Sequence, residues 1–584
     1  MCYFLVIMRR SFPIFVIILA VAIGCDDGTD GGDAGVDSGN IDDIFIIGGG
    51  SHLAIMIGEE CTFVNAPVDP YSLLDDEAGA AVDRTPAWIQ TDLASTLSSL
   101  NANTAAALAD QINGADEQWL DEVAWSIAVT DAPMLEWIVA DESEALFSEN
   151  AEAIYTIDEQ LDYVAIVDLD DGRSTLELMG ENGEFLLDVE KYYWYVVYPR
   201  AYFELPKYES GSFWRTFLVE DDSYDSTLLE HVSGAQDLPA AVLGIGEWIQ
   251  SFMTFQYGTN PPGILAIYNE PIGSCGQYAM ITSAASRAVL VPVATASARA
   301  DDHEWNEYWD ERWIMWDNSL GEIGSNPHYP YIDMPEIFDD DTYDGAGVLG
   351  ELAHVFRFRP DDNIFASELY TAYKDVVVGI TDSIGEPVEG ARVIVGSAEA
   401  GNAPCTWSYT DVLGEAAFRL GDDLGYRIEA SHPILGEQDS YGVVWTNTPD
   451  ELYTVDMQFT VPYPRLVQNV GDLPTGDIAV QLDFEVIETE QRRINQITEG
   501  YELGFTHPVI LEGGVVDVFV LNASAYQAFL TGSQFDGHSV SLATGGATTV
   551  LHASSDGQPL YLVFDNTLWP TSEKRVRIRL VPSE

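Results

Sequence analysis

Basic residues are scarce in this chain, and their scarcity excludes whole classes of partner. The 584 residues include 24 Lys and Arg against 96 Asp and Glu, which gives a formal net charge of -72 at pH 7. The lysines are Lys191, Lys207, Lys374 and Lys574. A surface of this charge repels phosphate backbones, so we expect no binding to nucleic acid. Such a surface is typical of a protein in which salt screens the self-repulsion.

Cysteine is also rare, and the sequence shows no metal-binding spacing. Two of the five cysteines, Cys2 and Cys25, lie near the N-terminus, while Cys61, Cys275 and Cys405 are far apart. The histidines are scattered without the spacing of a zinc site, and no calcium loop of the EF-hand type occurs. We therefore expect no metal and no cofactor. We also expect Cys61 and Cys405 to remain unpaired.

Long apolar runs are missing as well, but a short one near the N-terminus is typical of an export signal. Residues 11–24 are apolar, too short to span a bilayer comfortably, and follow Arg9 and Arg10. The run ends in "AIGC", which resembles the lipobox of bacterial lipoproteins with Ala22 in place of the usual Leu. The resemblance implies that residues 1–24 are a signal peptide and that Cys25 is lipidated.

An ordinary signal peptide or an uncleaved anchor is the alternative for this leader, and translation starts at Met1 or Met8. Residues 25–45 form an acidic tether, rich in Gly and Asp, with little apolar surface to bury. We expect an exported protein that is lipid-anchored to a bacterial membrane and faces the periplasm or the cell surface. The sequence does not distinguish the inner from the outer membrane.

Beyond the tether, the texture of the sequence changes several times, which predicts a multidomain α+β and β protein. Strand-like and amphipathic helical patterns mix in the first part, aromatic residues dominate the second, and short alternating strands with Gly and Pro turns fill the rest. The predicted domains are a mixed helical and strand domain at residues 46–190, an α+β domain at 191–365, a β-sandwich at 372–460 and a second β-sandwich at 461–584.

The first predicted sandwich resembles the carboxypeptidase regulatory-like domain, which is immunoglobulin-like. The resemblance implies a structural or adhesive role for this segment, and the final β-domain could bind a surface or glycan ligand. The matching residues are Gly379, Asp382, Gly385, Pro387, Val388, Gly390, Ala391, Thr410, Asp411, Gly414 and Phe418.

The stretch "GSCGQYAM" places a cysteine where a nucleophile would be useful. Ser274 and Gln277 match a capping box, so Cys275 is expected to be the first residue of a helix. The free N–H groups and the positive end of the helix dipole there favour a thiolate, and they can bind the oxyanion of an attacked amide. Gly273 and Gly276 leave room for a substrate backbone.

A nucleophile of this kind needs a base, and "DDHEWNEYWDERWIMWDNS" supplies a candidate. "HEWNEYW" and "RWIMWD" alternate as two strands, with a turn near Asp310. If paired residues sum to 620, His303 faces Asp317, which would orient the imidazole. That register is common for such a loop but not forced. Asn318 is the alternative orienting residue.

A cysteine at a helix start, a histidine on the next strand and an aspartate on the strand after resemble the transglutaminase-like superfamily, closest to its peptide:N-glycanase-like branch. The resemblance implies a papain-like α+β core with Cys275 as nucleophile, His303 as general base and acid, and Asp317 as orienting carboxylate. Glu304 departs from the family, which usually has an aliphatic residue or alanine there. The residues that carry the likeness are Gly273, Cys275, Gly276, Tyr278, Ala279, Arg287, Ala288, Pro292, His303, Trp305, Glu307, Trp313 and Asp317.

The expected activity is that of a cysteine enzyme on amide bonds of proteins or peptides, through a thioester, with hydrolysis favoured over transamidation. Ser274, Gly276, Gln277 and Trp305 are expected to support the site, bind the oxyanion or line a substrate groove. Tryptophans at such positions are more often core residues than groove residues, and the same holds for Trp305, Trp309, Trp313 and Trp316. The competing hypothesis is a surface adhesin or scaffold whose transglutaminase-like domain no longer turns over.

Overall fold

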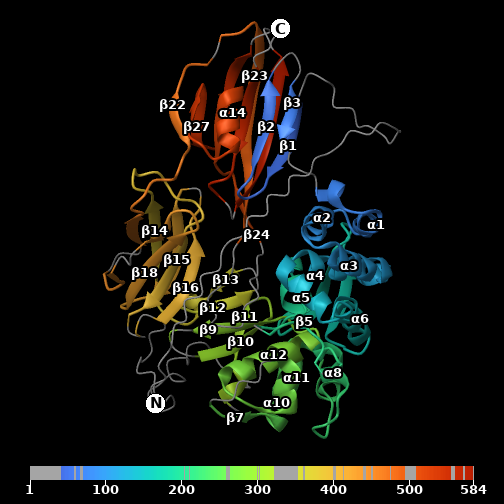
Figure 1. Ribbon diagram of the computed structural model, residues 1–584. Coiled ribbons are helices and arrows are strands. Elements are labelled where there is room, and N and C mark those ends of the chain that lie inside the picture. The colour runs from blue at the N-terminus through green and yellow to red at the C-terminus, as the bar shows by residue number, and fades with distance from the viewer. Residues whose placement is uncertain are drawn as a thin grey trace. The chain divides into compact units, whose positions relative to one another are not determined.

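We describe the chain from a computed structural model, drawn as a ribbon in Figure 1. Residues 41–582 are described, with gaps, so the predicted leader and Cys25 lie outside the described residues. The gaps are residues 58–60, 66–69, 203, 210, 258–262, 299, 301–302, 321–352, 360–361, 399–400, 402, 412, 439–441, 449–451, 474, 493–507, 554–558 and 570–571.

A group of helices follows the first strands, and side chains at their N-caps set where several of them begin. Asp75, Asn101 and Asp131 each accept a hydrogen bond from the backbone N–H three residues on, which satisfies a donor that the helix itself leaves unpaired. The helices are α1 (Asp76–Arg84), α2 (Gln90–Ser99), α3 (Ala102–Gly114), α4 (Leu120–Ala128), α5 (Ala132–Ala140) and α6 (Leu146–Asp158).

One hydrophobic core continues from these helices into the part of the chain that carries Cys275. Val82 and Leu135 belong to the same cluster of buried residues as Ile281 and Trp316. The expected boundary between residues 190 and 191 therefore falls inside one packed body, because apolar residues from both sides share a core. Between them lie β4 (Val164–Asp168), β5 (Ser174–Gly180), β6 (Gly183–Leu186), α7 (Val189–Tyr192), a π-helical turn (Tyr193–Val197), α8 (Trp214–Glu220) and α9 (Leu228–Val232).

An antiparallel sheet with strand order β11-β10-β9-β12-β13 carries the expected histidine. Helix α12 packs against β9 and β10 (Figure 1), and every residue of β9 is buried between neighbours. The elements are α10 (Leu238–Phe252), β7 (Thr254–Phe255), α11 (Ile264–Asn269), β8 (Ile272–Gly273), α12 (Cys275–Ala288), β9 (Val293–Ala298), β10 (His303–Trp309), β11 (Trp313–Trp316), β12 (Phe356–Arg359) and β13 (Asp362–Phe365).

Two sheets around a separate core form the next part of the chain, in agreement with a β-sandwich. One has the order β17-β14-β21, the other has the order β16-β15-β18-β19, and β20 pairs with β18. Val378, Val393 and Tyr426 lie in their common core. The strands are β14 (Tyr373–Thr381), β15 (Arg392–Ser397), β16 (Ala403–Tyr409), β17 (Glu415–Gly421), β18 (Gly425–His432), β19 (Gly436–Gln438), β20 (Val443–Trp445) and β21 (Leu452–Gln458).

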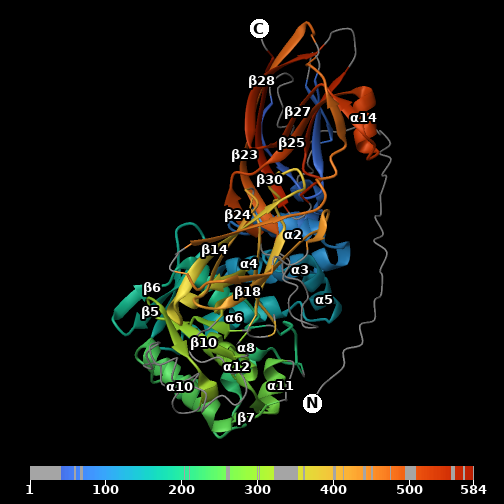
Figure 2. The same ribbon diagram turned by 90° about the vertical axis from the view of Figure 1, so that its left-hand side faces the viewer.

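The last part is also built from packed sheets, but strands from the N-terminal end complete it. β1 (Ile41–Ile47) pairs with β30 (Ser572–Pro582), and β2 (His52–Ile57) pairs with β29 (Leu560–Asp565), both antiparallel. The blue N-terminal strands accordingly lie among the red C-terminal ones in Figures 1 and 2. We expected residues 25–45 to be a tether and residues 461–584 to form a β-sandwich by themselves. Instead, β1 and β2 share a hydrophobic core with the last strands of the chain.

Helix α14 covers the outer face of one of these sheets. Tyr526 and Phe529 of the helix pack against Phe519 of β25 and Val563 of β29, and Figure 2 shows α14 beside these strands. The remaining elements are β3 (Thr62–Asn65), β22 (Val467–Val470), β23 (Ile478–Arg492), β24 (Pro508–Glu512), β25 (Val516–Asn522), α14 (Ala523–Leu530), β26 (Phe535–Gly537), β27 (Ser539–Thr544) and β28 (Gly546–Ala553).

Membrane-spanning candidates are few in the part of the chain that the structure describes. No single helix there is long and apolar enough to cross a bilayer. The pair Glu117–Ala128 and Ala132–Ala140 passes on length and composition when taken together, with a bend of 112° between its helices.

Candidate functional site

Cys275 is the first residue of α12, as its sequence context predicts. Ser274 is the N-cap, and Gln277 forms the capping box with it. The Gln277 side-chain oxygen accepts hydrogen bonds from the backbone N–H of Ser274 at 3.1 Å and from its hydroxyl at 3.0 Å. The Cys275 side chain is half-buried, so it is accessible to solvent at the positive end of a 14-residue helix.

Two polar contacts fix α12 to the strand that carries His303. The side-chain amide of Asn306 donates to the carbonyl oxygen of Ala279 at 3.0 Å and to the hydroxyl of Ser283 at 2.9 Å. All three residues are buried, and nearly the whole of α12 is buried with them. Because buried polar groups need partners, these bonds define one position of the strand against the helix.

The two glycines around the cysteine are required by close contacts, but with the protein's own side chains. A Cβ at Gly273 would lie 2.3 Å from the Cβ of Gln277. A Cβ at Gly276 would lie 2.8 Å from Oε2 of Glu304. The space that was expected to admit a substrate backbone is therefore occupied, at Gly276 by a carboxylate.

His303 and Asp317 form a buried pair beside the cysteine. The Nε2 atom of His303 lies 2.7 Å from Oδ2 of Asp317, and each side chain is no more than 2% exposed. The other carboxylate oxygen, Oδ1, accepts hydrogen bonds from the backbone N–H of Ser319 at 2.9 Å and from its hydroxyl at 2.6 Å. His303 also forms a side-chain hydrogen bond with Cys275. Because Nε2 faces Asp317, the ring presents Nδ1 to the sulfur.

The charges of these neighbours determine the protonation of the imidazole. Burial lowers the pKa of His303, but the charge and hydrogen bond of Asp317 raise it, and so do the hydrogen bond and charge of Cys275. The net result raises the pKa of His303 to about 10. The ring is therefore an imidazolium at neutral pH.

The hairpin that brings His303 and Asp317 together has a different register from the expected one. Asn306 pairs with Trp316 and Trp309 with Trp313, so paired residues sum to 622 and not to 620. The turn centres on Glu311, which has a positive φ of 55°. Asp317 therefore reaches His303 along a diagonal of the ladder, a distance that long side chains can bridge.

A polar network supports His303 from behind. Trp305 is buried, stacks on the imidazole at 5.5 Å between ring centroids, and donates from Nε1 to the Tyr370 hydroxyl at 2.9 Å. Tyr370 donates in turn to Glu307, which also accepts from Arg357. Trp305 is thus a core residue that supports His303 and does not line a groove. Glu307 accepts hydrogen bonds from Tyr370 and Arg357.

Three other residues considered in the sequence do not join the group formed by Cys275, His303 and Asp317. Asn318, the alternative orienting residue, donates to the Thr282 hydroxyl at 3.0 Å. Cys61 packs against the core that β1 and β2 share with β29 and β30. Cys405 is buried in the first sandwich, where its thiol donates to the carbonyl of Val395 at 3.3 Å. Among the described residues no cluster of three potential metal ligands occurs.

Sequence reasoning missed two neighbours of the site. Ser319 follows Asp317 by two positions, and a serine two residues after an aspartate is a recognisable local turn. Tyr202 donates to Oε1 of Glu304 at 2.6 Å from 102 positions away. No local pattern links these two residues, so the pair is found only in the folded chain.

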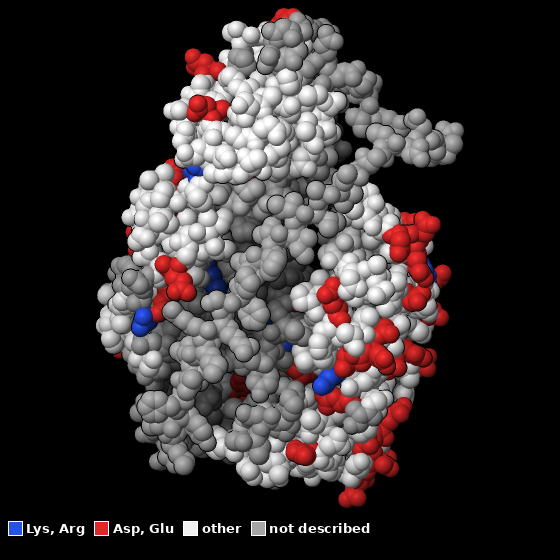
Figure 3. Space-filling view, in the orientation of Figure 1, with Lys and Arg blue, Asp and Glu red and all other residues white. Residues whose placement is uncertain are grey.

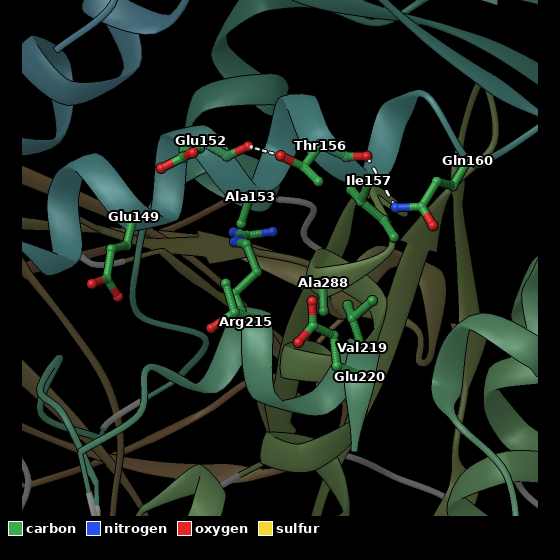
Figure 4. Close-up of a pocket in the computed structure, with 11 residues that line it drawn as sticks. Glu149, Glu152, Ala153, Thr156, Ile157, Gln160, Arg215, Val219, Glu220 and Ala288 are labelled. Carbon is green, nitrogen blue, oxygen red and sulfur yellow. Dashed lines mark hydrogen bonds between the residues drawn. The ribbon is translucent and has the colours of Figure 1, made fainter. Parts of the chain in front are cut away.

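A cavity of about 250 Å³ lies apart from this site (Figure 4). Glu149 and Glu152 of α6 and Arg215 and Glu220 of α8 line it, together with Ala288. Ala288 is the last residue of α12 and Cys275 is the first, so the cavity lies roughly 20 Å from the sulfur by the rise of an α-helix. None of Cys275, His303 and Asp317 lines this cavity.

Acidic side chains dominate the described surface around the helices. On the face shown in Figure 3, Asp and Glu gather over the part of the chain that carries α3, α6 and α8, and Lys and Arg are few. Such a field raises the local concentration of cations and repels anions. The site cluster itself is shielded from it, because His303 and Asp317 are buried.

Comparisons with known proteins give only distant likenesses. No protein-family model and no curated protein matches the chain. Among solved structures, a "Putative Cysteine Protease" from Cytophaga hutchinsonii is 23% identical, covers 16% of this chain and 35% of its own, and has a TM-score of 0.15. Red sea bream transglutaminase is 11% identical, covers 78% of this chain and 81% of its own, and has a TM-score of 0.19.

A shaft pilin from Lactobacillus rhamnosus GG is 8% identical and covers 33% of this chain and 87% of its own, with a TM-score of 0.15. This chain spans about 35% of the Cytophaga protein that it matches. TM-scores this low establish neither fold nor function, so the chemistry of the site rests on its own geometry.

Proposed function

We propose that this chain is a transglutaminase-like cysteine enzyme that acts on amide bonds of proteins or peptides. The observation that carries the proposal is the hydrogen-bonded series from Cys275 through His303 to Asp317, at the start of a helix. A nucleophile, a base and an orienting carboxylate in this order are what acyl transfer requires. The raised pKa of His303 fits an imidazolium that waits to donate a proton.

In the first half of the proposed reaction, the Cys275 thiolate attacks the amide carbonyl carbon and a C–S bond forms. The tetrahedral intermediate collapses as the C–N bond breaks, and the imidazolium of His303 gives its proton to the departing amine. The products are a thioester on Cys275 and a free amine. Backbone N–H groups at the start of α12 are suited to stabilise the oxyanion of the intermediate.

In the second half, neutral His303 takes a proton from the incoming nucleophile, which attacks the thioester carbonyl. The C–S bond breaks and the thiolate returns with the imidazolium. Water as nucleophile gives a carboxylic acid, whereas an amine gives a new amide. We propose hydrolysis as the main outcome. Self-cross-linking is disfavoured, because the chain has only four lysines and Lys574 is buried.

The cellular setting is part of the proposal. A lipid on Cys25 and an acidic tether would hold the enzyme at a bacterial membrane, with the β-sandwiches available for a surface or glycan ligand. The substrate would be an exported or extracellular protein or peptide.

A second candidate function is a surface scaffold that no longer turns over. The observation in its favour is Glu304, whose carboxylate oxygen lies against Gly276, next to the N–H groups that would stabilise an oxyanion. A carboxylate in that position opposes an anionic intermediate unless a cation accompanies it.

Alkylation of the thiols separates the two functions without knowledge of the substrate. Iodoacetamide at pH 6 should modify Cys275 much faster than Cys61 in the intact chain, and buried Cys405 should not react, as measured by mass spectrometry of peptides. Cys275→Ala should abolish amide hydrolysis on a peptide library, while Cys61→Ala, a matched cysteine removal outside the cluster, should leave it unchanged. Slow, similar labelling of Cys275 and Cys61 would favour the scaffold.

A further inference from the structure

Ser319 holds one of the two carboxylate oxygens of Asp317. The Oδ1 atom accepts hydrogen bonds from the backbone N–H of Ser319 at 2.9 Å and from its hydroxyl at 2.6 Å. The second bond has the length of a charge-assisted O–H···O⁻ hydrogen bond. Each carboxylate oxygen offers about two acceptor sites, so these bonds occupy Oδ1 and leave Oδ2 to face Nε2 of His303 at 2.7 Å.

An aspartate does not fix the direction of its own carboxylate. The terminal torsion of this side chain is broad, so the rotamer alone does not select which oxygen faces a given partner. Asp317 is only 2% exposed, so burial has removed most of the water that would otherwise bind its oxygens. Ser319 is half-buried and supplies donors in place of that water. The direction of the carboxylate therefore depends on Ser319.

The turn that contains Ser319, Asn318–Leu320, packs against α10 and α12. The side-chain amide of Asn318 donates to the hydroxyl of Thr282 in α12 at 3.0 Å, and both residues are buried. Gln250 of α10 donates to the backbone carbonyl of Asn318. Thr282 lies seven positions after Cys275, a spacing that puts both residues on one face of the helix. The helix that begins with the nucleophile therefore also fixes the turn that carries the serine hydroxyl.

The protonation of His303 depends on the direction of the Asp317 carboxylate as well as on its charge. Burial lowers the pKa of His303, whereas the charge of Asp317 and then its hydrogen bond raise it, with a net result of about 10. A hydrogen bond weakens steeply as its angle departs from linearity. A carboxylate that turns away from Nε2 would therefore hold the imidazolium less well.

We propose that Ser319 is a positioning residue whose hydroxyl holds the carboxylate of Asp317 toward His303. The imidazole thereby stays aligned with the sulfur of Cys275. Ser319 acts through Asp317 and takes no part in bond formation. This inference rests on the proposed function and adds a fourth side chain to the series that carries it. The backbone N–H of residue 319 is present whatever the side chain, so the hydroxyl is the part that a substitution can remove.

Ser319→Ala tests the hydroxyl alone. Losing one hydrogen bond to a charged group corresponds to a change of ~10–100-fold, so kcat on a peptide amide should fall ~10-fold or more while KM changes less than ~2-fold. The pKa of His303 should fall from about 10 to about 9 or below. It is read without substrate from the NMR signal of the labelled ring carbon, identified by its absence in His303→Gln. Ser319→Thr keeps the hydroxyl and should restore both kcat and the pKa of His303.

Ser143→Ala is the matched control, because Ser143 also donates its hydroxyl to the aspartate two positions before it, Asp141, at 3.1 Å. This variant should change neither kcat nor the pKa of His303. An unchanged or higher pKa of His303 in Ser319→Ala would overturn the inference. If Cys275→Ala abolishes turnover while Ser319→Ala titrates like the unmodified chain, the proposed function stands and the positioning role falls. If Cys275→Ala keeps turnover, the proposed function falls, and the titration still decides whether Ser319 positions the buried pair.

Discussion

Replacing Asp317 by asparagine should disable Cys275 through the geometry of Ser319. The Oδ1 atom of Asp317 accepts two hydrogen bonds from Ser319, and Oδ2 accepts one from His303. An asparagine that keeps its oxygen toward Ser319 must point its NH₂ group at Nε2. That forces Nε2 to accept and puts the ring proton on Nδ1, the atom that faces the sulfur, where it cannot take a proton.

The opposite orientation of the asparagine is also costly. With its oxygen toward His303, the NH₂ group faces the backbone N–H of Ser319, and this donor loses its acceptor. An unsatisfied donor of this kind costs ~1–3 kcal/mol, and the neutral amide no longer stabilises the imidazolium in either orientation. In serine triads the same change lowers kcat by ~10⁴. We expect a loss of ~10²–10⁴ in turnover and of at least ~10-fold in the alkylation rate of Cys275 at pH 6.

The assay is peptide mass spectrometry after timed iodoacetamide treatment, with Cys61 as an internal reference. Asp310→Asn is a matched control, because Asp310 is buried in the same hairpin but accepts from the backbone N–H of Glu181, away from the cluster. Asp310→Asn should leave Cys275 alkylation unchanged. If Asp317→Asn also alkylates at the original rate, Asp317 does not set the state of His303 and the reasoning is refuted.

The pKa of His303 is raised to about 10 in the folded state. The pairing of His303 should therefore add up to ~5 kcal/mol to the free energy of unfolding below pH 6.5, and this contribution should disappear as the pH rises toward 10. Urea unfolding at pH 7 and pH 10 should show a smaller decrease in this free energy for Asp317→Asn than for the unmodified chain. Lys574 and Glu389 form a buried ion pair, so Lys574→Met alone should cost ~3–5 kcal/mol, and adding Glu389→Leu should recover most of it; additive losses would contradict this. Gly276→Ala should lower the stability of the folded chain by ~1–3 kcal/mol, because the added Cβ meets the Glu304 carboxylate. Adding Glu304→Ala to this variant should restore most of the lost melting temperature, whereas adding Glu270→Ala should not.

Local patterns predicted the elements of the site well. The capping residues Ser274 and Gln277 located the first turn of α12, since a cap depends on side chains a few positions apart. Alternation located β10 and β11 for the same reason. The predicted pairing of these two strands was wrong by two residues. A slip of two residues keeps every side chain on the same face of the sheet, so the hydrophobic pattern cannot detect it. The positive φ at Glu311 shifts the turn without a glycine to mark it.

Long-range partners could not be predicted from the sequence. Tyr202 and Glu304 meet because a loop and a strand pack on one helix, and neither residue is unusual in its local context. Changes of composition along the chain do not coincide with the limits of the hydrophobic cores. The aromatic run near Tyr193 reads as the start of a new domain, yet its side chains fill the same core as the preceding helices. The composition of a segment indicates that it is apolar enough to be buried, but it does not show which other segment it packs against.

The pairing of β1 with β30 affects how the chain can be made. Their partners are separated by about 530 positions along the sequence, and a ribosome adds only ~5–20 residues each second. The first strand therefore waits for roughly half a minute or longer, with an unpaired edge that other chains could capture. A polypeptide truncated before residue 572 lacks β30, so the edge of β1 stays unpaired. We therefore expect such truncated chains to aggregate even though they contain every residue of the cysteine site.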